Sequence, residues 1–169
     1  EDWEYEKYPN TRTSSALGLR GLYYLPYRAA LGLEYRSFGD TWGVNADHWQ
    51  ISYRHPASDR LTYELRYRYY QQNRADFYRD LFDFEDQQNY MARDKELSTF
   101  TSQTFGATAS YKIALSNGWL DSASVNLSVD HVRFDYADFR DARSGAPLGE
   151  EPFYHFSANV LQLYLSAWF

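Results

Sequence analysis

Apolar and polar side chains alternate along the last nine residues of the chain. The odd positions are apolar and hold Leu161, Leu163, Leu165, Ala167 and Phe169. The even positions are polar or aromatic and hold Gln162, Tyr164, Ser166 and Trp168. A period of two predicts a β-strand with two unlike faces. Since a tilted strand of about 9 to 11 residues crosses a bilayer, this segment is long enough to do so.

The same alternation recurs in six earlier segments, again with apolar residues at odd positions. We therefore predict an all-β fold whose seven antiparallel strands each pair with the next. The predicted strands span residues 13–24, 27–38, 46–55, 60–72, 99–113, 119–136 and 153–169.

The predicted connections between these strands alternate in length. Short turns are expected at 24–27, 55–60 and 116–118, and long connections at 38–46, 71–101 and 135–153. Short periplasmic turns and longer extracellular loops alternate in this way in bacterial outer-membrane barrels. The pattern predicts an antiparallel, up-and-down transmembrane β-barrel with its C-terminus in the periplasm and residues 1–10 outside the cell.

An odd number of strands does not fit such a barrel, because bacterial single-chain barrels have even numbers of strands. Either Trp3 to Tyr8 supplies a short eighth strand, or residues 1–169 are a single domain that forms the C-terminal part of a longer barrel. The charges of Glu1, Asp2, Glu4, Glu6 and Lys7 favour the second interpretation. The expected partners are then outer-membrane lipids, and the remaining strands of the same barrel or another envelope protein.

Composition agrees with a membrane barrel in spite of 24% charged residues and a mean hydropathy of −0.69. A barrel exposes only alternate residues to lipid and keeps a polar interior, so its average hydropathy is low. No run of 18 apolar residues exists, which excludes a transmembrane helix. Aromatic residues make up 20% of the chain and predict an aromatic girdle. The net charge of −6 offers no basic surface for nucleic acid.

Basic residues dominate the polar face of the predicted strands. Those that we expect to line a pore are Arg20, Arg28, Arg36, Arg54, Arg66, Arg68 and Lys112, with the acidic residues Glu34, Glu64 and Asp130. Turning such a basic residue to lipid costs ~2 to 4 kcal/mol near the bilayer midplane, so this face is predicted to point inward. Two interpretations remain. The lumen is open and attracts anions, or Glu34 and Glu64 pair with neighbouring arginines and brace a filled wall.

The alternation changes phase in the last two predicted strands. Beyond Val129 the apolar residues occupy even positions, at Val132, Phe134, Tyr136, Tyr154, Phe156, Ala158 and Val160. We predict that this hairpin continues beyond the membrane and turns its aromatic face, including Phe134 and Phe156, inward.

Evidence for catalysis or metal binding is weak. The adjacent pairs Asp47–His48 and Asp130–His131 point to opposite faces of their strands, so neither can form a catalytic dyad. A cluster of carboxylates at Asp80, Asp83, Glu85 and Asp86 lacks the glycine turn of a calcium loop and is interpreted as solvated loop charge. We therefore expect no enzymatic activity, no cofactor and no metal.

Three stretches resemble a known bacterial outer-membrane family. They are Tyr35 to Trp49 (YRSFGDTWGVNADHW), Arg66 to Tyr78 (RYRYYQQNRADFY) and the end from Val132 (VRFDYADFRD, then GEEPFYHFSANVLQLYLSAWF). Together they resemble the family catalogued as domain of unknown function 3570. This chain has Asp40-Thr41-Trp42-Gly43 where the family tends to have an Asp pair before Trp-Gly. The resemblance implies the bacterial outer membrane and a longer barrel, and it assigns no activity.

Two classes of function follow from the predicted outer-membrane barrel. The first is a passive, porin-like pore or transport component of the Gram-negative envelope with an arginine-lined lumen. The alternative is a structural or adhesive envelope protein that binds a partner through its long acidic extracellular loops. An outer-membrane enzyme, such as a protease or phospholipase, comes third.

Overall fold

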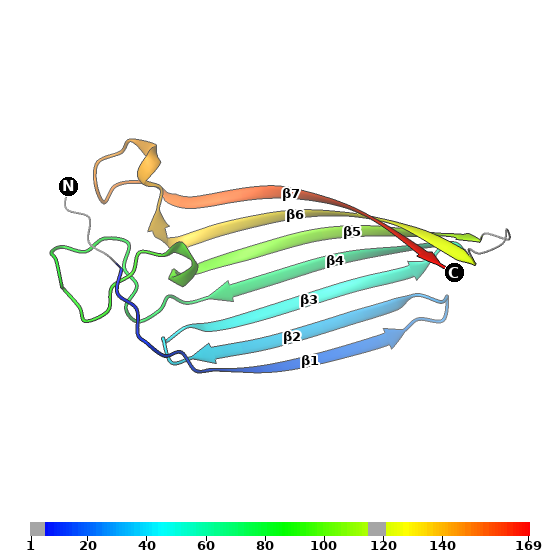
Figure 1. Ribbon diagram of the computed structural model, residues 1–169, viewed down its shortest axis with the longest axis horizontal. Coiled ribbons are helices and arrows are strands. Elements are labelled where there is room, and N and C mark those ends of the chain that lie inside the picture. Colours follow the sequence, from blue (N-terminus) through cyan, green and yellow to red (C-terminus); the bar gives the residue numbers. More distant parts are fainter. Residues whose placement is uncertain (1–5, 115–120) are drawn as a thin grey trace.

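The computed structural model describes residues 6–114 and 121–169, which form one curved antiparallel sheet with a layer of loops at one end (Figure 1). The strands are β1 (Ser14–Tyr24), β2 (Ala30–Asp40), β3 (Asn45–Pro56), β4 (Leu61–Gln72), β5 (Phe100–Ala114), β6 (Ser122–Arg140) and β7 (Phe153–Trp168). Their order in the sheet is their order in the chain, as predicted. The predicted turn at 116–118 and the first two residues of the predicted sixth strand lie outside the described residues.

Five strands lie within one residue of their predicted bounds, and two differ by more. β2 begins at Ala30 rather than at residue 27, because Arg28 adopts a left-handed backbone conformation with φ of 66° in the turn before it. β6 continues to Arg140, past the predicted end at 136, with a register shift against β7 between Asp135 and Arg140. Helical structure in the described residues is limited to two 3₁₀ turns, η1 (Lys95–Leu97) and η2 (Ala142–Ser144). Neither of these turns has the length and hydropathy that a helix needs to cross a membrane.

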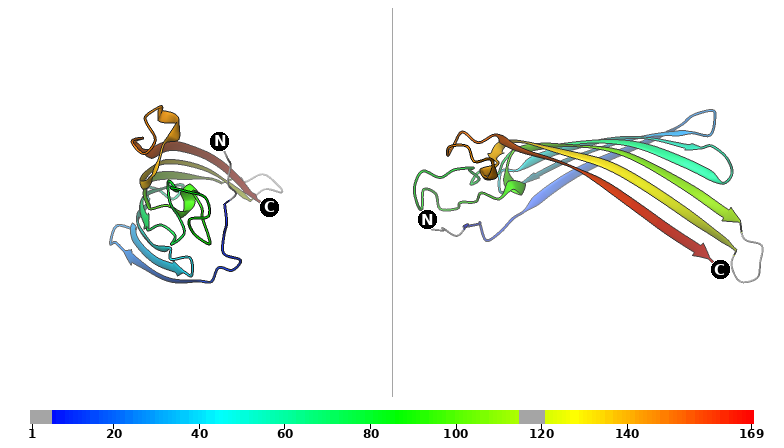
Figure 2. Two further views of the ribbon diagram at one scale, coloured as in Figure 1. Left: turned by 90° about the vertical axis from the view of Figure 1, so that its left-hand side faces the viewer. Right: turned by 90° about the horizontal axis from the view of Figure 1, so that it is seen from above.

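The sheet is open. Within the described residues, β1 pairs only with β2 and β7 pairs only with β6. Seen from its loop end, the sheet forms an arc rather than a ring (Figure 2). The predicted seven-stranded antiparallel sheet is therefore confirmed, whereas closure into a barrel is not shown by the described part of the chain.

The less favoured alternative, a short eighth strand at Trp3 to Tyr8, does not join the sheet where this segment is described. Its first three residues lie outside the described chain, and Lys7 forms an isolated antiparallel bridge with Met91 of the loop layer. Residues 6–13 run along the same end of the sheet as the long loops (Figure 1).

The two faces of the sheet differ as the alternation predicts. The odd-numbered aliphatic residues lie on the convex face and are widely exposed, with Leu161 70%, Leu163 63% and Leu165 74% exposed. The even-numbered residues lie on the concave face, where the loop between β4 and β5 folds inside the curve of the sheet (Figure 2). Gln72 on this face donates hydrogen bonds to the backbone oxygens of Glu96 and Ser98 of that loop.

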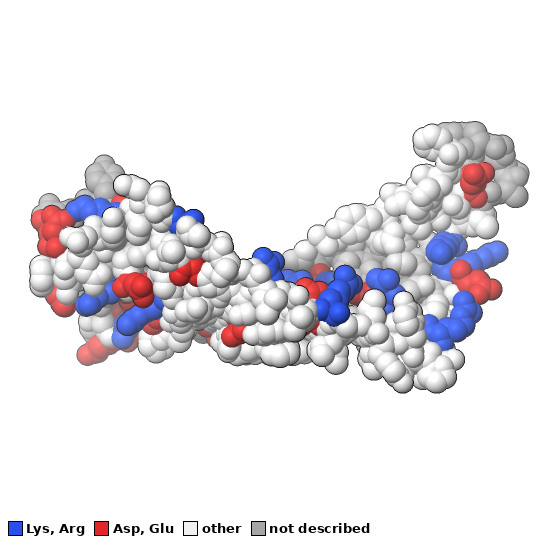
Figure 3. Space-filling model, turned by 90° about the horizontal axis from the view of Figure 1, so that it is seen from below, with Lys and Arg blue, Asp and Glu red and all other residues white. Residues whose placement is uncertain are grey.

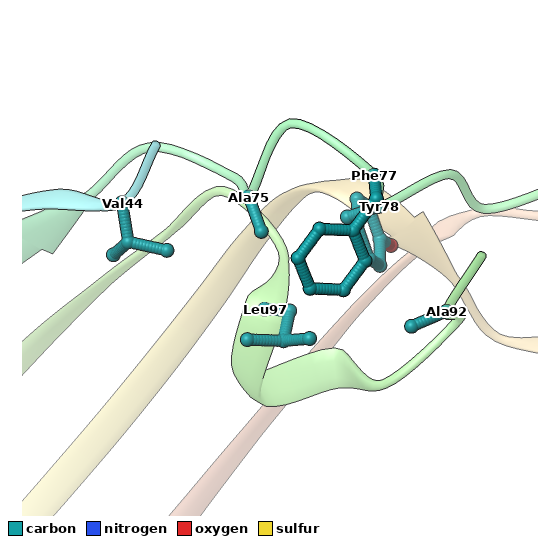
Figure 4. Packing of buried hydrophobic residues seen from close by; sticks show 6 residues of the cluster. All are labelled: Val44, Ala75, Phe77, Tyr78, Ala92 and Leu97. Atoms are coloured by element: carbon teal, nitrogen blue, oxygen red, sulfur yellow. The ribbon is translucent and has the colours of Figure 1, made fainter. Parts of the chain in front are cut away.

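The main buried apolar cluster lies within the loop layer, against the end of the sheet. It comprises Val44, Ala75, Phe77, Tyr78, Ala92 and Leu97 (Figure 4), with Phe38, Trp42 and Phe139 packed against it. Tyr78 is 1% exposed, and its hydroxyl donates to the backbone oxygen of Asp138 at 2.9 Å. Burial raises the pKa of Tyr78 well above its ordinary value, because the phenolate would be desolvated. The loops are therefore folded into a packed layer of their own.

Candidate binding cavity on the concave face

Strand register places nine of the ten predicted pore-lining residues on the strands of the concave face. Facing residues of adjacent antiparallel strands share a face. The register pairs include Arg20 with Glu34, Arg36 with His48, Arg54 with Glu64, Arg66 with Gly106, Gly106 with Asp130, Gln50 with Arg68, and Lys112 with Ser124. In the space-filling view, basic and acidic residues lie in the hollowed middle of the molecule, at the end opposite the loop layer and over the loop layer itself (Figure 3).

Arg28 is the exception. It lies in the turn between β1 and β2, and its Nη1 is 3.4 Å from Oδ1 of Asp59 in the neighbouring turn between β3 and β4. Both side chains are largely exposed, at 68% and 91%. The structure therefore places Arg28 at the end of the sheet rather than along its wall. The alternation missed this because the left-handed turn shifts the start of β2.

One ion pair crosses an entire strand. Nη2 of Arg66 in β4 donates to Oδ1 of Asp130 in β6 at 2.5 Å, over Gly106 of the intervening β5. A Cβ atom on Gly106 would lie 2.3 Å from that carboxylate oxygen, so a side chain at this position would have to displace the ion pair or shift the strand. A glycine inside a strand marks such close approaches, and this was the signal available in the sequence.

A second brace joins Arg54 to Glu64, whose Oε2 accepts from Nε at 2.8 Å and from Nη2 at 2.6 Å. The bracing expected of Glu64 is thus observed. Glu34, in contrast, makes no ion pair with any residue that the structure describes, although it lies opposite Arg20. Part of the concave wall is braced, and part carries unneutralised charge.

A cavity of about 700 Å³ lies on this face next to the loop layer. β2, β3 and β4 supply its basic side, with Arg36, His48 and Arg68. β5, β6 and β7 supply its apolar side, with Phe100, Phe134 and Val160. Arg12 and Glu96 line it from the loop layer. Two different chemistries therefore meet across one cavity.

The basic side of the cavity has spare donor capacity. Arg36 and Arg68 form no ion pair in the described part of the chain, and Arg68 makes only a long 3.5 Å hydrogen bond from Nε to Gln50. Nε2 of His48 is buried and has no hydrogen-bond partner among the residues that the structure describes. His48 lies opposite Arg36 in the β2–β3 register, so the unpartnered nitrogen and the arginine are neighbours on the same face of the sheet.

The apolar side is a row of packed aromatic rings, of which one pair is stacked. Phe134 and Phe156 are parallel to within 7°, with centroids 4.7 Å apart. Phe100 continues the row, 5.8 Å from Phe134 and 5.5 Å from Tyr70. The predicted change of phase is confirmed, because Phe134 lines the cavity and faces Phe156 in register on the concave side.

The candidate dyads are separated as expected. Asp47 accepts from the hydroxyl of Tyr35 at 2.7 Å, whereas His48 lines the cavity on the opposite face. Asp130 binds Arg66, whereas Nδ1 of His131 lies 2.8 Å from Oδ1 of Asn159.

The interpretation of the acidic cluster as solvated charge is wrong for Asp80. Its carboxylate is 8% exposed and binds two arginines, Arg93 at 3.1 Å and Arg140 at 3.0 Å. Arg140 also donates its backbone N–H to Oδ1 of Asp80. No group of three metal-ligating side chains is found among the described residues. Asp80 therefore ties the loop after β4 to the end of β6, a contact between residues 60 positions apart that local sequence could not reveal.

The turn between β2 and β3 contains the Asp-Thr-Trp-Gly motif noted in the sequence. The Asp40 side chain is fully buried, and its Oδ1 accepts the backbone N–H groups of Trp42 and Val44. Its Oδ2 accepts from Arg12 Nε at 2.7 Å and Nη2 at 2.6 Å. Gly43 has φ of 83°, which favours glycine. This motif fixes the first hairpin of the loop layer and closes one edge of the cavity through Arg12.

Comparison with known proteins gives a family and no function. The family model described as Protein of unknown function (DUF3570) matches residues 1–131. No curated protein and no solved structure matches the chain.

Proposed function

The chain belongs to the DUF3570 family of proteins of unknown function, and we propose that it is part of a transmembrane β-barrel of the bacterial outer membrane that passes anions. In this proposal the convex face contacts lipid, and the concave face lines the lumen. β7 ends in the periplasm, and the loop layer lies outside the cell.

The exposed aliphatic band on the convex face carries the proposal. Its described members include Leu19, Leu33, Ile51, Leu65, Leu127, Val129, Leu161, Leu163 and Leu165, each more than 40% exposed. Patches of this kind are rarely left in water and mark membrane or protein contacts. Within β1 to β7, Arg133 is the only arginine or lysine at an odd-numbered position, and it lies beyond the aliphatic band, toward the loop layer. The other arginines and the lysine of these strands occupy even-numbered positions. Lipid on one side and water on the other satisfies both faces.

Aromatic residues flank the aliphatic band. Tyr23, Tyr53, Tyr63 and Tyr111 lie on the convex face toward the short turns, and Tyr35, Trp49, Tyr67, Tyr69 and Phe105 lie on it toward the loop layer. Tyr35 and Trp49 pack at 4.2 Å, and Tyr67 and Phe105 at 4.8 Å. Aromatic girdles at the two membrane interfaces have this arrangement.

The open edges support the presence of further strands. In hydrocarbon, each unpaired backbone group costs several kcal/mol, which is why spanning sheets close. Further strands of the same barrel, or strands of another envelope protein, would pair with β1 and β7.

The unbalanced charge of the concave face supports anion passage. Four of its basic residues have no ion-pair partner in the described chain: Arg20, Arg36, Arg68 and Lys112. Of its three predicted acidic residues, Glu64 and Asp130 are paired, and only Glu34 is unpaired among the described residues. A passage lined mainly by one sign of charge concentrates ions of the opposite sign.

Reversal potentials of the intact protein in planar bilayers under a salt gradient test the proposal. We expect selectivity for anions, and a reduced preference when Arg36→Gln and Arg68→Gln are combined. Arg143→Gln serves as the control, since Arg143 lies in the loop layer and pairs with Asp141. Cation selectivity of the wild type would refute the proposal.

A second candidate is a structural or adhesive role for the loop layer. Phe84 and Leu148 are 64% and 81% exposed at loop tips, which favours contact with a partner. An intact protein that inserts into bilayers without conducting would favour this role.

A further inference from the structure

The cavity beside the loop layer separates a basic side from an aromatic side. Arg36, His48 and Arg68 come from β2, β3 and β4, whereas Phe100 and Phe134 come from β5 and β6. A passage for inorganic anions requires the basic residues but does not require the aromatic ones. The combination fits a solute that has a charged group at one end and a ring at the other.

The charge on the basic side is available to a ligand. Arg66 also lines the cavity, but its Nη2 is committed to Asp130. Arg36 and Arg68 have no such partner among the described residues, and the buried Nε2 of His48 has no hydrogen bond. Guanidinium groups bind carboxylate and phosphate through paired N–H donors. An anionic oxygen at this point would satisfy the arginines and would also accept a hydrogen bond from His48 when Nε2 carries the proton.

Two acidic residues line the cavity, Asp130 and Glu96, and a third, Glu34, lies on the same face two residues before Arg36 but outside the lining. Asp130 is neutralised by Arg66, and Glu96 belongs to η1, at the loop end of the cavity. The backbone oxygen of Glu96 accepts from Gln72, which holds this turn against β4. The charged end of a ligand is therefore directed toward Arg36, His48 and Arg68 on β2, β3 and β4 rather than toward the loop.

The aromatic side offers a ready stacking surface. Phe134 is already held parallel to Phe156 at 4.7 Å, and Phe100 is held between Tyr70 and Phe134. Rings fixed by such neighbours lose little freedom when a further ring packs on them. The volume of about 700 Å³ falls within the range of small-molecule sites, about 300 to 1,000 Å³.

We propose that this cavity binds an aromatic organic anion, with its acidic group on Arg36 and Arg68 and its ring against Phe100 and Phe134. The inference rests on the proposed function, since it names the class of solute that the lumen selects. It assigns the two arginines to charge recognition and the two phenylalanines to recognition of the ring.

Equilibrium dialysis of the intact protein in detergent micelles against 2-naphthoate tests the site, with empty micelles as the blank. We expect saturable binding, and weaker binding of both 2-naphthylmethanol, which lacks the charge, and acetate, which lacks the ring. Arg36→Gln or Arg68→Gln should each weaken naphthoate binding by about tenfold, the typical effect of losing a hydrogen bond to a charged group. Phe134→Leu should weaken it as well.

Arg20→Gln is the matched control, because Arg20 lies on the same concave face outside the cavity and is exposed. A test on the unaltered protein complements the variants: raising the chloride concentration should weaken the binding of naphthoate and leave that of naphthylmethanol unchanged. The proposal is overturned by non-saturable uptake, by equal binding of the neutral alcohol, or by equal effects of Arg20→Gln and Arg36→Gln.

Failure of this inference is distinguishable from failure of the proposed function. A wild-type protein that conducts anions but does not bind naphthoate overturns the aromatic-anion site alone. A wild-type protein that is selective for cations overturns the proposed function, whatever the dialysis shows.

Discussion

Arg66 and Asp130 form an ion pair across the strand that separates them, because that strand has a glycine at the crossing point. Nη2 and Oδ1 are 2.5 Å apart, and Gly106 lies in register with both residues. The two side chains are 23% and 14% exposed, so solvent screens the pair less than a surface pair. Because Gly106 has no side chain, one ion pair joins three strands of the concave wall, β4, β5 and β6.

Replacing this glycine should therefore loosen the wall. In Gly106→Ala the new Cβ would lie 2.3 Å from Oδ1 of Asp130 and 2.9 Å from Nη2 of Arg66, so the pair must separate or the strand must shift. We expect a loss of about 1 to 3 kcal/mol in the free energy of unfolding, as in other overpacked sites. Urea unfolding of the intact protein in lipid vesicles measures this loss.

Gly18→Ala is the control for this measurement. Gly18 also lies in a strand at an even position, and a Cβ there would meet nothing within 4 Å. If the two variants lose equal stability, the crossing at Gly106 is not what holds β4, β5 and β6 together.

Asp40 should be essential for the first hairpin of the loop layer. Asp40→Ala leaves Arg12 without its carboxylate and leaves the N–H groups of Trp42 and Val44 without an acceptor. We expect a loss of about 2 to 4 kcal/mol, because the carboxylate is fully buried. The same unfolding measurement on Asp59→Ala provides the comparison. Asp59 is 91% exposed, so that variant should stay within about 0.5 kcal/mol of the wild type.

Tyr78 should make the loop layer sensitive to alkaline pH. Burial raises its pKa in the folded protein above the ordinary value of 10.0, so the unfolded chain releases the phenolic proton first. The contribution of Tyr78 to stability is therefore complete below pH 10 and decreases as the pH rises above that value. Hydrogen exchange of the loop amides at increasing pH measures the loosening. Tyr78→Phe should reduce the dependence on pH, and an unchanged dependence would mean that other groups cause it.

The strands could be predicted from the sequence because their pattern is local. The alternation located all seven strands and both faces, and its change of phase beyond Val129 indicated where Phe134 and Phe156 point. These predictions depend only on the two-residue period of a strand, which neighbouring residues reveal. Arg28 was placed wrongly because its own backbone has a φ of 66°, which puts it in the turn before β2 rather than on the wall.

The cavity and the loop core could not be predicted in this way, because they depend on long-range contacts. Tyr78 meets Asp138, and Asp80 meets Arg140, across 60 positions of sequence in each case. The acidic composition of the loop suggested solvated charge and gave no sign of a packed layer. Similarly, a glycine within a strand suggests a close approach, but the register of β4, β5 and β6 is needed to identify Arg66 and Asp130 as the two residues that meet over Gly106.

The central claim, that the convex face contacts lipid and the concave face contacts water, is most directly tested along β6. The sequence contains no cysteine, so a single nitroxide can be placed in turn at Val125, Asn126, Leu127, Ser128 and Val129 of the intact protein in lipid vesicles. The account predicts that collisions with oxygen, which dissolves in lipid, peak at 125, 127 and 129. Collisions with a water-soluble nickel chelate should be low at these three sites, where the label faces lipid. Equal access of the nickel chelate at all five positions, with no alternation in the oxygen signal, would contradict it.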